Sequence, residues 1–305
     1  MSLIVEHLSK SFNGKTAVKD LSFEFKEPGV FALLGTNGAG KSTSIRMILN
    51  MLKKDGGTVL WKGKPLEVTE EKIGYLSEER GLYPKYNILE QMYYFASLKG
   101  MKRTQATAAI DYLFERLKIN EYRKNKAEQL SKGNQQKVQL AATLISDPEL
   151  LILDEPLSGL DPVNADVFKS IIREERDKGK FIIMSSHQMA TIEEFCEDLV
   201  LLHRGETVLE GNLNEIKKSY GRVNLTVKAD GSYLPLAAEC GLTVVEDTPN
   251  GTDFKVPREE MAHDLLRRML ENGIGVITFD LREPSLHELF VEKCGNGEEA
   301  EKNEA

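Results

Sequence analysis

One run of residues near the N-terminus decides the fold: Gly35-Thr36-Asn37-Gly38-Ala39-Gly40-Lys41-Ser42-Thr43. Its spacing, a glycine, four residues, then glycine, lysine and serine, is that of a phosphate-binding loop. Glycines allow backbone N–H groups to turn toward phosphate oxygens, so such a loop can hold a nucleoside triphosphate. The residues that we expect to bind it are Gly35, Asn37, Gly38, Gly40, Lys41, Ser42 and Thr43. The alternative is an ordinary glycine turn between a strand and a helix.

The flanking segments favour the phosphate-binding interpretation. Residues 30–34 are all apolar, which is typical of a strand buried on both faces. Apolar residues recur at helical spacing in residues 42–52, and the start of that helix would direct its positive end at the anion. We expect Lys41 to reach the terminal phosphates and the Ser42 hydroxyl to bind Mg²⁺.

A second apolar run, residues 150–153, ends in two carboxylates, Asp154 and Glu155. Asp154 is placed to hold the Mg²⁺ shell, and Glu155 can polarise an attacking water as a general base. Alone, the pair could mark a simple boundary between strand and loop. Beside a phosphate-binding loop, it indicates nucleotide hydrolysis.

Apolar strands alternate with helices along residues 1–220, which predicts an α/β fold with a mainly parallel sheet. Residues 1–27 read as strands of an antiparallel subdomain, and about 84–140 read as a helical insertion. After residue 220 the pattern restarts, and residues 221–293 predict a small α+β domain. The acidic residues 294–305 predict a disordered tail.

Composition narrows the class of protein. A length of 305 residues favours two domains, and a net charge of -8 argues against binding to nucleic acid. No stretch approaches the roughly 20 apolar residues that cross a bilayer, and the N-terminus has no secretory-signal pattern. Cys196, Cys240 and Cys294 lie too far apart in the sequence to indicate a metal site or a disulfide framework. We expect a cytoplasmic protein.

Further motifs resemble those of the ATPases of ABC transporters. Leu130-Ser131-Lys132-Gly133-Asn134 resembles the signature motif LSGGQ, and Ser158-Gly159-Leu160-Asp161 resembles the D-loop of that family. His187 is similar to its switch histidine, although a lone histidine is often an ordinary polar residue. Phe12 matches its adenine-stacking aromatic, although it also fits a core or hairpin residue. The set covers about residues 1–215 in the order of the family.

The resemblance implies a P-loop NTPase fold and a head-to-tail homodimer that encloses two ATP molecules with Mg²⁺. One subunit would supply the phosphate-binding loop, and the other would supply Ser131 and Gly133 of the signature motif. Asp161 of the D-loop would also bind the nucleotide. Glu155 and His187 would be catalytic, with His187 at the γ-phosphate. The alternative for Ser131 is that it only caps a helix.

Three residues depart from the family pattern. Glu78 stands where the family has a glutamine, after a run resembling Ile-Gly-Tyr-Leu-Pro. A glutamate can coordinate Mg²⁺ or orient a water, so we include Glu78 among the expected catalytic and metal-binding residues; its alternative is a surface acid. Lys132 replaces a signature glycine without being expected to disable the site, and Asn134 replaces the signature glutamine.

The segment 78–84 also resembles a bacterial subgroup that drives exporters of sodium ions, drugs or polysaccharide, and residues 221–293 match its small C-terminal domain in position and size. The leading hypothesis is therefore an ATP-hydrolysing exporter subunit, peripheral on the inner face of the membrane through a separate integral membrane permease. Coupling would pass through the helical insertion and the loop 78–86. The alternatives are a non-transport ABC ATPase acting on DNA or the ribosome, and a non-hydrolysing nucleotide sensor.

Overall fold

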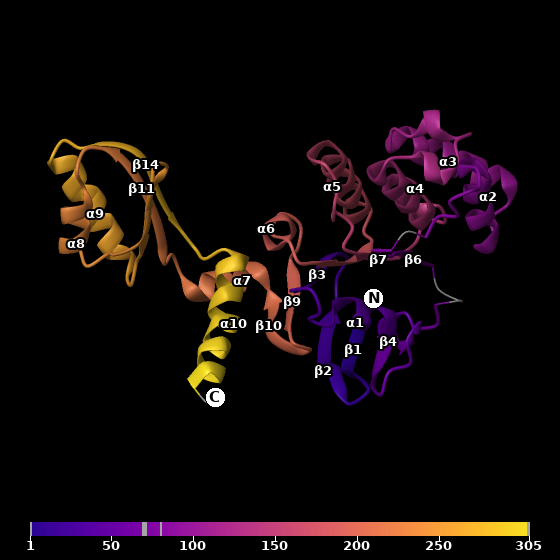
Figure 1. Cartoon of the computed structure of the whole chain (residues 1–305), viewed down its shortest axis with the longest axis horizontal. Coiled ribbons are helices and arrows are strands. Elements are labelled where there is room, and N and C mark those ends of the chain that lie inside the picture. Colours follow the sequence, from indigo (N-terminus) through magenta and orange to yellow (C-terminus); the bar gives the residue numbers. More distant parts are fainter. Residues whose placement is uncertain (1, 69–71, 80, 304–305) are drawn as a thin grey trace. The chain divides into compact units, whose positions relative to one another are not determined.

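The chain divides into two units, Met1–Glu210 and Gly211–Ala305, in a computed structural model that describes residues 2–68, 72–79 and 81–303 (Figure 1). The predicted boundary lies ten residues later, after residue 220. The difference arises because the helix α7 (Leu213–Tyr220) contacts its own C-terminal unit, where the Lys293 ammonium lies 5.8 Å from the centre of the Tyr220 ring.

A six-stranded sheet with the order β10-β9-β3-β8-β7-β6 is the centre of the N-terminal unit. Its strands are β3 (Gly29–Gly35), β6 (Ile73–Leu76), β7 (Leu150–Asp154), β8 (Phe181–Ser186), β9 (Asp198–His203) and β10 (Glu206–Asn212). Strand β3 pairs in parallel with β8 and β9, and β7 pairs in parallel with β6 and β8. Every residue of β3, β7 and β8 is buried, which explains their continuous apolar sequences. The prediction of a mainly parallel sheet is confirmed.

A second, antiparallel sheet packs against the first. Its order is β2-β1-β4-β5, from the strands β1 (Leu3–Phe12), β2 (Lys15–Phe25), β4 (Gly56–Trp61) and β5 (Lys64–Pro65). Aromatic side chains join the two sheets, with ring centres 4.5 Å apart for Phe23 and Phe31 and 5.1 Å apart for Trp61 and Phe181. Helix α1 (Lys41–Ile48) shares this core through Ile45. The core therefore fixes the position of α1, the helix that follows the phosphate-binding loop.

The remaining helices of this unit follow the predicted order. The helical insertion contains α2 (Ile88–Leu98), α3 (Arg103–Arg116) and α4 (Lys132–Leu144), which Figure 1 shows together beside the β6–β7 edge. Helices α5 (Pro162–Asp177) and α6 (Met189–Ile192) follow β7 and β8. Helix α1 ends at Ile48, earlier than the predicted residue 52, because Asn50 adopts a left-handed backbone with φ of 54°.

The C-terminal unit is the small α+β domain that the pattern predicts. Its antiparallel sheet has the order β12-β13-β11-β14, from β11 (Asn224–Asp230), β12 (Thr243–Thr248), β13 (Gly251–Lys255) and β14 (Gly275–Arg282). Helices α8 (Leu234–Glu239) and α9 (Glu259–Glu271) enclose a core with this sheet that includes Leu225, Phe254 and Leu265. Helix α10 (Leu286–Asn303) covers most of the predicted disordered tail, whose residues 304–305 lie outside the described residues.

Candidate functional site

The phosphate-binding loop connects the buried end of β3 to the start of α1. Two of its glycines are required by the space around them as well as by their backbone. A Cβ atom on Gly35, whose φ is 150°, would lie 2.3 Å from the Leu202 carbonyl oxygen. A Cβ atom on Gly40, whose φ is 107°, would lie 2.6 Å from the Ala17 carbonyl oxygen. The loop is therefore pressed against β9 and β2, and only glycine fits at both positions.

Lys41 lies buried at the floor of this loop. Its ammonium donates to the carbonyl oxygens of Gly35, at 2.8 Å, and Thr36, at 3.2 Å, and lies 3.3 Å from Glu155 Oε1. Glu155 is also buried, and its Oε1 accepts no hydrogen bond from any residue within the described ranges. The Lys41 ammonium and the Glu155 carboxylate therefore form a buried ion pair, in which the attraction is stronger than it would be in water.

The two acidic residues lie where β7 ends, next to β8 in the parallel sheet. Asp154 Oδ1 accepts a 2.5 Å hydrogen bond from the Ser185 hydroxyl and lies 3.3 Å from the Ser42 hydroxyl. The second oxygen of Glu155, Oε2, lies 2.9 Å from His187 Nδ1. The neighbouring strands β3, β8 and β7 bring together Lys41, His187 and Glu155, which are far apart in the sequence.

A cavity of about 340 Å³ opens over these groups. Its lining consists of one residue of β2, most of the phosphate-binding loop and two glutamates: Ala17, Asn37, Gly38, Gly40, Lys41, Ser42, Thr43, Glu78 and Glu155. Glu78 is exposed, and it faces the same space as the phosphate-binding loop. Four of the residues expected at this site, Phe12, Gly35, Asp154 and His187, are not among the lining residues. Phe12 ends β1 beside a hairpin turn, and the residue is 45% exposed.

Two residues of this region do not appear among the sequence-based candidates. Ala17 of β2 lines the cavity, and its signal in the sequence is only a small side chain in an alternating strand. Ser185 is fully buried and bonds to both acidic residues. A pair of serines that ends an apolar strand just before a histidine could have indicated it.

Three expected residues form a separate group, which we call the signature cluster: Ser131, Gly133 and Asp161. None of them lines the cavity around Lys41. Ser131 is the N-cap of α4 and accepts a 3.3 Å hydrogen bond from Asn134 N. A Cβ atom on Gly133 would lie 2.8 Å from Asn164 Nδ2, and Asn164 in turn is bonded to Asp161.

The Asp161 carboxylate is held as the N-cap of α5. Backbone and side-chain hydrogen bonds from Asn164 keep the pKa of the Asp161 carboxyl below its usual value. The carboxylate is therefore charged at neutral pH. The signature cluster thus joins the starts of α4 and α5.

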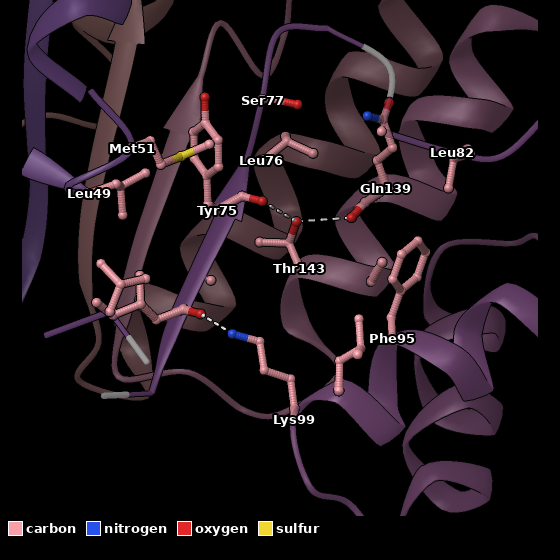
Figure 2. Close-up of a pocket in the computed structure, with 16 residues that line it drawn as sticks. Leu49, Met51, Tyr75, Leu76, Ser77, Leu82, Phe95, Lys99, Gln139 and Thr143 are labelled. Carbon is pink, nitrogen blue, oxygen red and sulfur yellow. Dashed lines mark hydrogen bonds between the residues drawn. The ribbon is translucent and has the colours of Figure 1, made fainter. Parts of the chain in front are cut away.

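A mostly apolar pocket of about 290 Å³ lies beside β6 (Figure 2). It is lined by residues that follow α1, by residues of β6, α2 and α4, and by the loop between β6 and α2, among them Leu49, Met51, Leu76, Leu82 and Phe95. Burial and the nearby Asp154 carboxylate raise the pKa of the Tyr75 hydroxyl in its wall. The pocket therefore lies near the end of β7 without being lined by Asp154 or Glu155.

An exposed group of aromatic residues, which we call the tyrosine cluster, lies close by: Tyr83, Tyr86 and Tyr94 border a cavity of about 480 Å³ together with Glu90 and Gln91. Gln91 is buried and fixes the turn, since it accepts from Tyr83 N and donates to the carbonyl oxygens of Tyr83 and Tyr86. The tyrosine cluster is therefore a preformed surface. Only five positions separate Glu78 from Tyr83, and Arg80 between them lies outside the described residues.

The chain is similar to known ATP-binding proteins of ABC transporters. Residues 18–158 match the ABC transporter family model, and residues 211–294 match the DrrA1-3-like C-terminal domain. The ABC transporter ATP-binding protein YhaQ of Bacillus subtilis is 42% identical over 96% of this chain and 98% of its own length. A fluoroquinolones export ATP-binding protein of Mycobacterium tuberculosis is 34% identical over 92% of this chain and 88% of its own.

A solved ATP-binding subunit of an ABC transporter superposes with a TM-score of 0.67 at 28% identity, covering 72% of this chain and 94% of the other. Along the described ranges, none of the helices has the length and apolar character needed to cross a bilayer.

Proposed function

This chain belongs to the ABC transporter ATP-binding proteins and is an ATPase, and from that premise we propose that it powers an exporter whose membrane permease is a separate protein. The observation that supports ATP hydrolysis in this proposal is the contact of Glu155 with both Lys41, at 3.3 Å, and His187, at 2.9 Å, beside the phosphate-binding loop. The order of these groups is that of a site which binds a triphosphate and cleaves it.

The loop and its lysine bind the nucleotide. When the terminal phosphates of ATP enter, Lys41 turns from the carbonyl oxygens of the loop and from Glu155 toward them, because phosphate offers a stronger counter-charge. The N-terminus of α1 and the loop amides add further stabilisation. Phe12 is exposed near the open end of β1 and can stack on the adenine.

Mg²⁺ fits the oxygen donors present at the edge of the sheet. Ser42 Oγ and Asp154 Oδ1 lie 3.3 Å apart, and Glu78 faces the same cavity with a third oxygen donor. These three residues would hold the ion, which neutralises charge that develops on the phosphates.

Hydrolysis then depends on Glu155. Once Lys41 has moved to the phosphates, Glu155 Oε1 is free to accept a proton from the attacking water, while His187 holds Oε2 in place. The buried setting keeps competing water away from the carboxylate.

The site is completed by a second copy of the chain. Ser131 and Gly133 lie at the start of α4 and do not line the cavity around Lys41, so they are available to the nucleotide of a partner. A head-to-tail pair would place each signature cluster over the triphosphate that the other subunit binds. ATP binding closes this pair, and hydrolysis reopens it.

The permease would contact the helical insertion. The tyrosine cluster and the exposed Met51 and Leu98 at the pocket beside β6 offer apolar and aromatic side chains, the kind that marks protein interfaces. The segment from Glu78 to Tyr83 connects this surface to the nucleotide cavity. Relatives named for linearmycin resistance and fluoroquinolones export support an export role. We infer that the chain acts at the inner face of the membrane, where the permease would hold it.

The experiment is a Glu155→Gln variant of the full chain, compared with the wild type for ATP turnover and for mass in size-exclusion chromatography with Mg²⁺ and ATP. We expect turnover to fall by about 10²- to 10⁴-fold, the usual contribution of a general base, and a stable ATP-bound dimer to accumulate. Unchanged turnover would remove Glu155 as the base. ATP-dependent binding to DNA or ribosomes, with no stimulation by a membrane partner, would favour the non-transport alternative.

A further inference from the structure

We propose that Ser185 is a positioning residue of the ATPase site, whose single hydroxyl group fixes both the Asp154 carboxylate and the Glu155 backbone. The inference rests on the proposed roles of those two acids. It goes beyond them, because it assigns the geometry of the metal-binding and proton-accepting groups to one residue that touches neither the nucleotide nor the attacking water.

The contacts define how the hydroxyl is used. Ser185 is fully buried in β8, and the parallel register pairs it directly with Asp154 of β7. Its Oγ lies 2.5 Å from Asp154 Oδ1 and 2.9 Å from Glu155 N. A carboxylate and an N–H group leave one assignment only: the hydroxyl donates its proton to Asp154 and accepts from Glu155.

The backbone of Glu155 explains why such a partner is needed. Its φ is 49°, in the left-handed region that a residue with a side chain enters at a cost of about 1–2 kcal/mol. Such strain persists only where neighbouring contacts enforce it. The bond from Glu155 N to Ser185 holds this conformation, and the conformation directs the carboxylate toward Lys41 and His187.

The same hydroxyl extends toward the proposed metal ligands. Asp154 Oδ1, the atom that accepts from Ser185, also accepts a 3.3 Å hydrogen bond from Ser42 Oγ. A continuous series of contacts therefore runs from the Glu155 backbone through Ser185 to Asp154 and Ser42. Removing the hydroxyl frees both the base and the metal-binding carboxylate to rotate.

The neighbouring serine provides a matched control. Ser186 is also buried, but its hydroxyl accepts a 2.9 Å hydrogen bond from Gln188 N and contacts neither acid. Ser185→Ala and Ser186→Ala thus remove the same group from adjacent positions of one strand, with different consequences for the site.

The test measures steady-state ATP turnover of the full chain for both variants. We expect Ser185→Ala to lower kcat by roughly 10- to 100-fold with little change in KM for ATP, as for the loss of a hydrogen bond to a charged group. Ser186→Ala should keep kcat within about threefold of wild type, because its hydroxyl contacts neither acid. Ser185→Thr, which keeps the hydroxyl, should restore most of the rate.

A second measurement does not depend on turnover. The Mg²⁺ concentration that half-saturates binding of a fluorescent ATP analogue should rise several-fold for Ser185→Ala and remain unchanged for Ser186→Ala. In a Glu155→Gln background, Ser185→Ala should lower the residual rate little further but should still shift the Mg²⁺ midpoint.

The outcomes separate this inference from the proposed function. If Glu155→Gln abolishes turnover but Ser185→Ala keeps kcat and the Mg²⁺ midpoint, the role of Ser185 is wrong and the ATPase mechanism stands. If Glu155→Gln keeps full turnover, the proposed function itself fails. Equal loss in both serine variants, accompanied by a lower melting temperature, would show that the strand needs its packing only, and would overturn the positioning role.

Discussion

Replacing Gly40 by alanine should weaken ATP binding through the packing of the loop against β2. The new Cβ atom would lie 2.6 Å from the Ala17 carbonyl oxygen and 3.1 Å from Val18 Cγ2, in a backbone with φ of 107°. The carbonyl belongs to a strand and cannot move aside, so the loop must shift. Overpacking of this kind costs about 1–3 kcal/mol, and we expect ATP affinity to fall by roughly 10- to 100-fold.

Gly14→Ala is the matched control for this prediction. Its φ of 81° imposes a similar backbone strain, but no atom of the residues that the structure describes lies within 4 Å of the new Cβ, and Gly14 does not line the cavity. Titration of a fluorescent ATP analogue into each variant measures the affinity, and circular dichroism checks the fold. Equal affinities for the two variants would refute the argument that contact with β2 sets the position of the loop.

Two other predictions concern the C-terminal unit and the tyrosine cluster. Burial acts to raise the pKa of Glu288, but hydrogen bonds from Arg282 and Ser285 outweigh it and lower the pKa to about 2, from 4.5. The bonds therefore contribute stability that is present above pH 4.5 and is lost as the pH falls toward 2. Glu288→Gln should lower the free energy of urea unfolding by about 1 kcal/mol at pH 7, a value reduced for partial exposure, and by progressively less between pH 4.5 and 2. A loss that does not depend on pH would contradict the assignment. Tyr86→Ala should keep the ATP turnover of the isolated chain, since Tyr86 lies outside the nucleotide cavity, but it should lose stimulation by a co-purified permease. Tyr112→Ala, which changes an exposed tyrosine of α3, is the control. Equal stimulation of both variants would exclude the tyrosine cluster as the contact.

The sequence predicts well the features that depend on neighbouring residues. The phosphate-binding loop follows from glycine spacing, and β7 with its two acids follows from one apolar run, so the α/β class is confirmed. Contacts between distant segments are not visible in such patterns. Ser185 reaches Asp154 across 31 positions, and only the parallel pairing of β7 with β8 brings the two together.

Helix ends also depend on details that periodicity does not contain. The backbone of Asn50 ends α1 early, and the Asp161 cap begins α5 at Pro162. Helix α8 has six residues and a proline in its first turn, so its sequence offers too little periodicity to predict it. The capping contacts and the fold, rather than local propensity, set these boundaries.

The central claim is that each ATP site is completed by residues of a second copy, and mixing two inactive variants tests it most directly. Lys41→Ala disables the phosphate-binding loop, and Ser131→Arg disables the start of α4; each alone should show almost no ATP turnover. In a mixed pair, one site combines the intact loop of one chain with the intact Ser131 of the other. An equal mixture should therefore recover about one quarter of the wild-type rate, because half of the pairs are mixed and each has one working site. If both variants are inactive alone and the mixture recovers no activity at concentrations where the wild type forms dimers, Ser131 acts within its own chain and the account is contradicted.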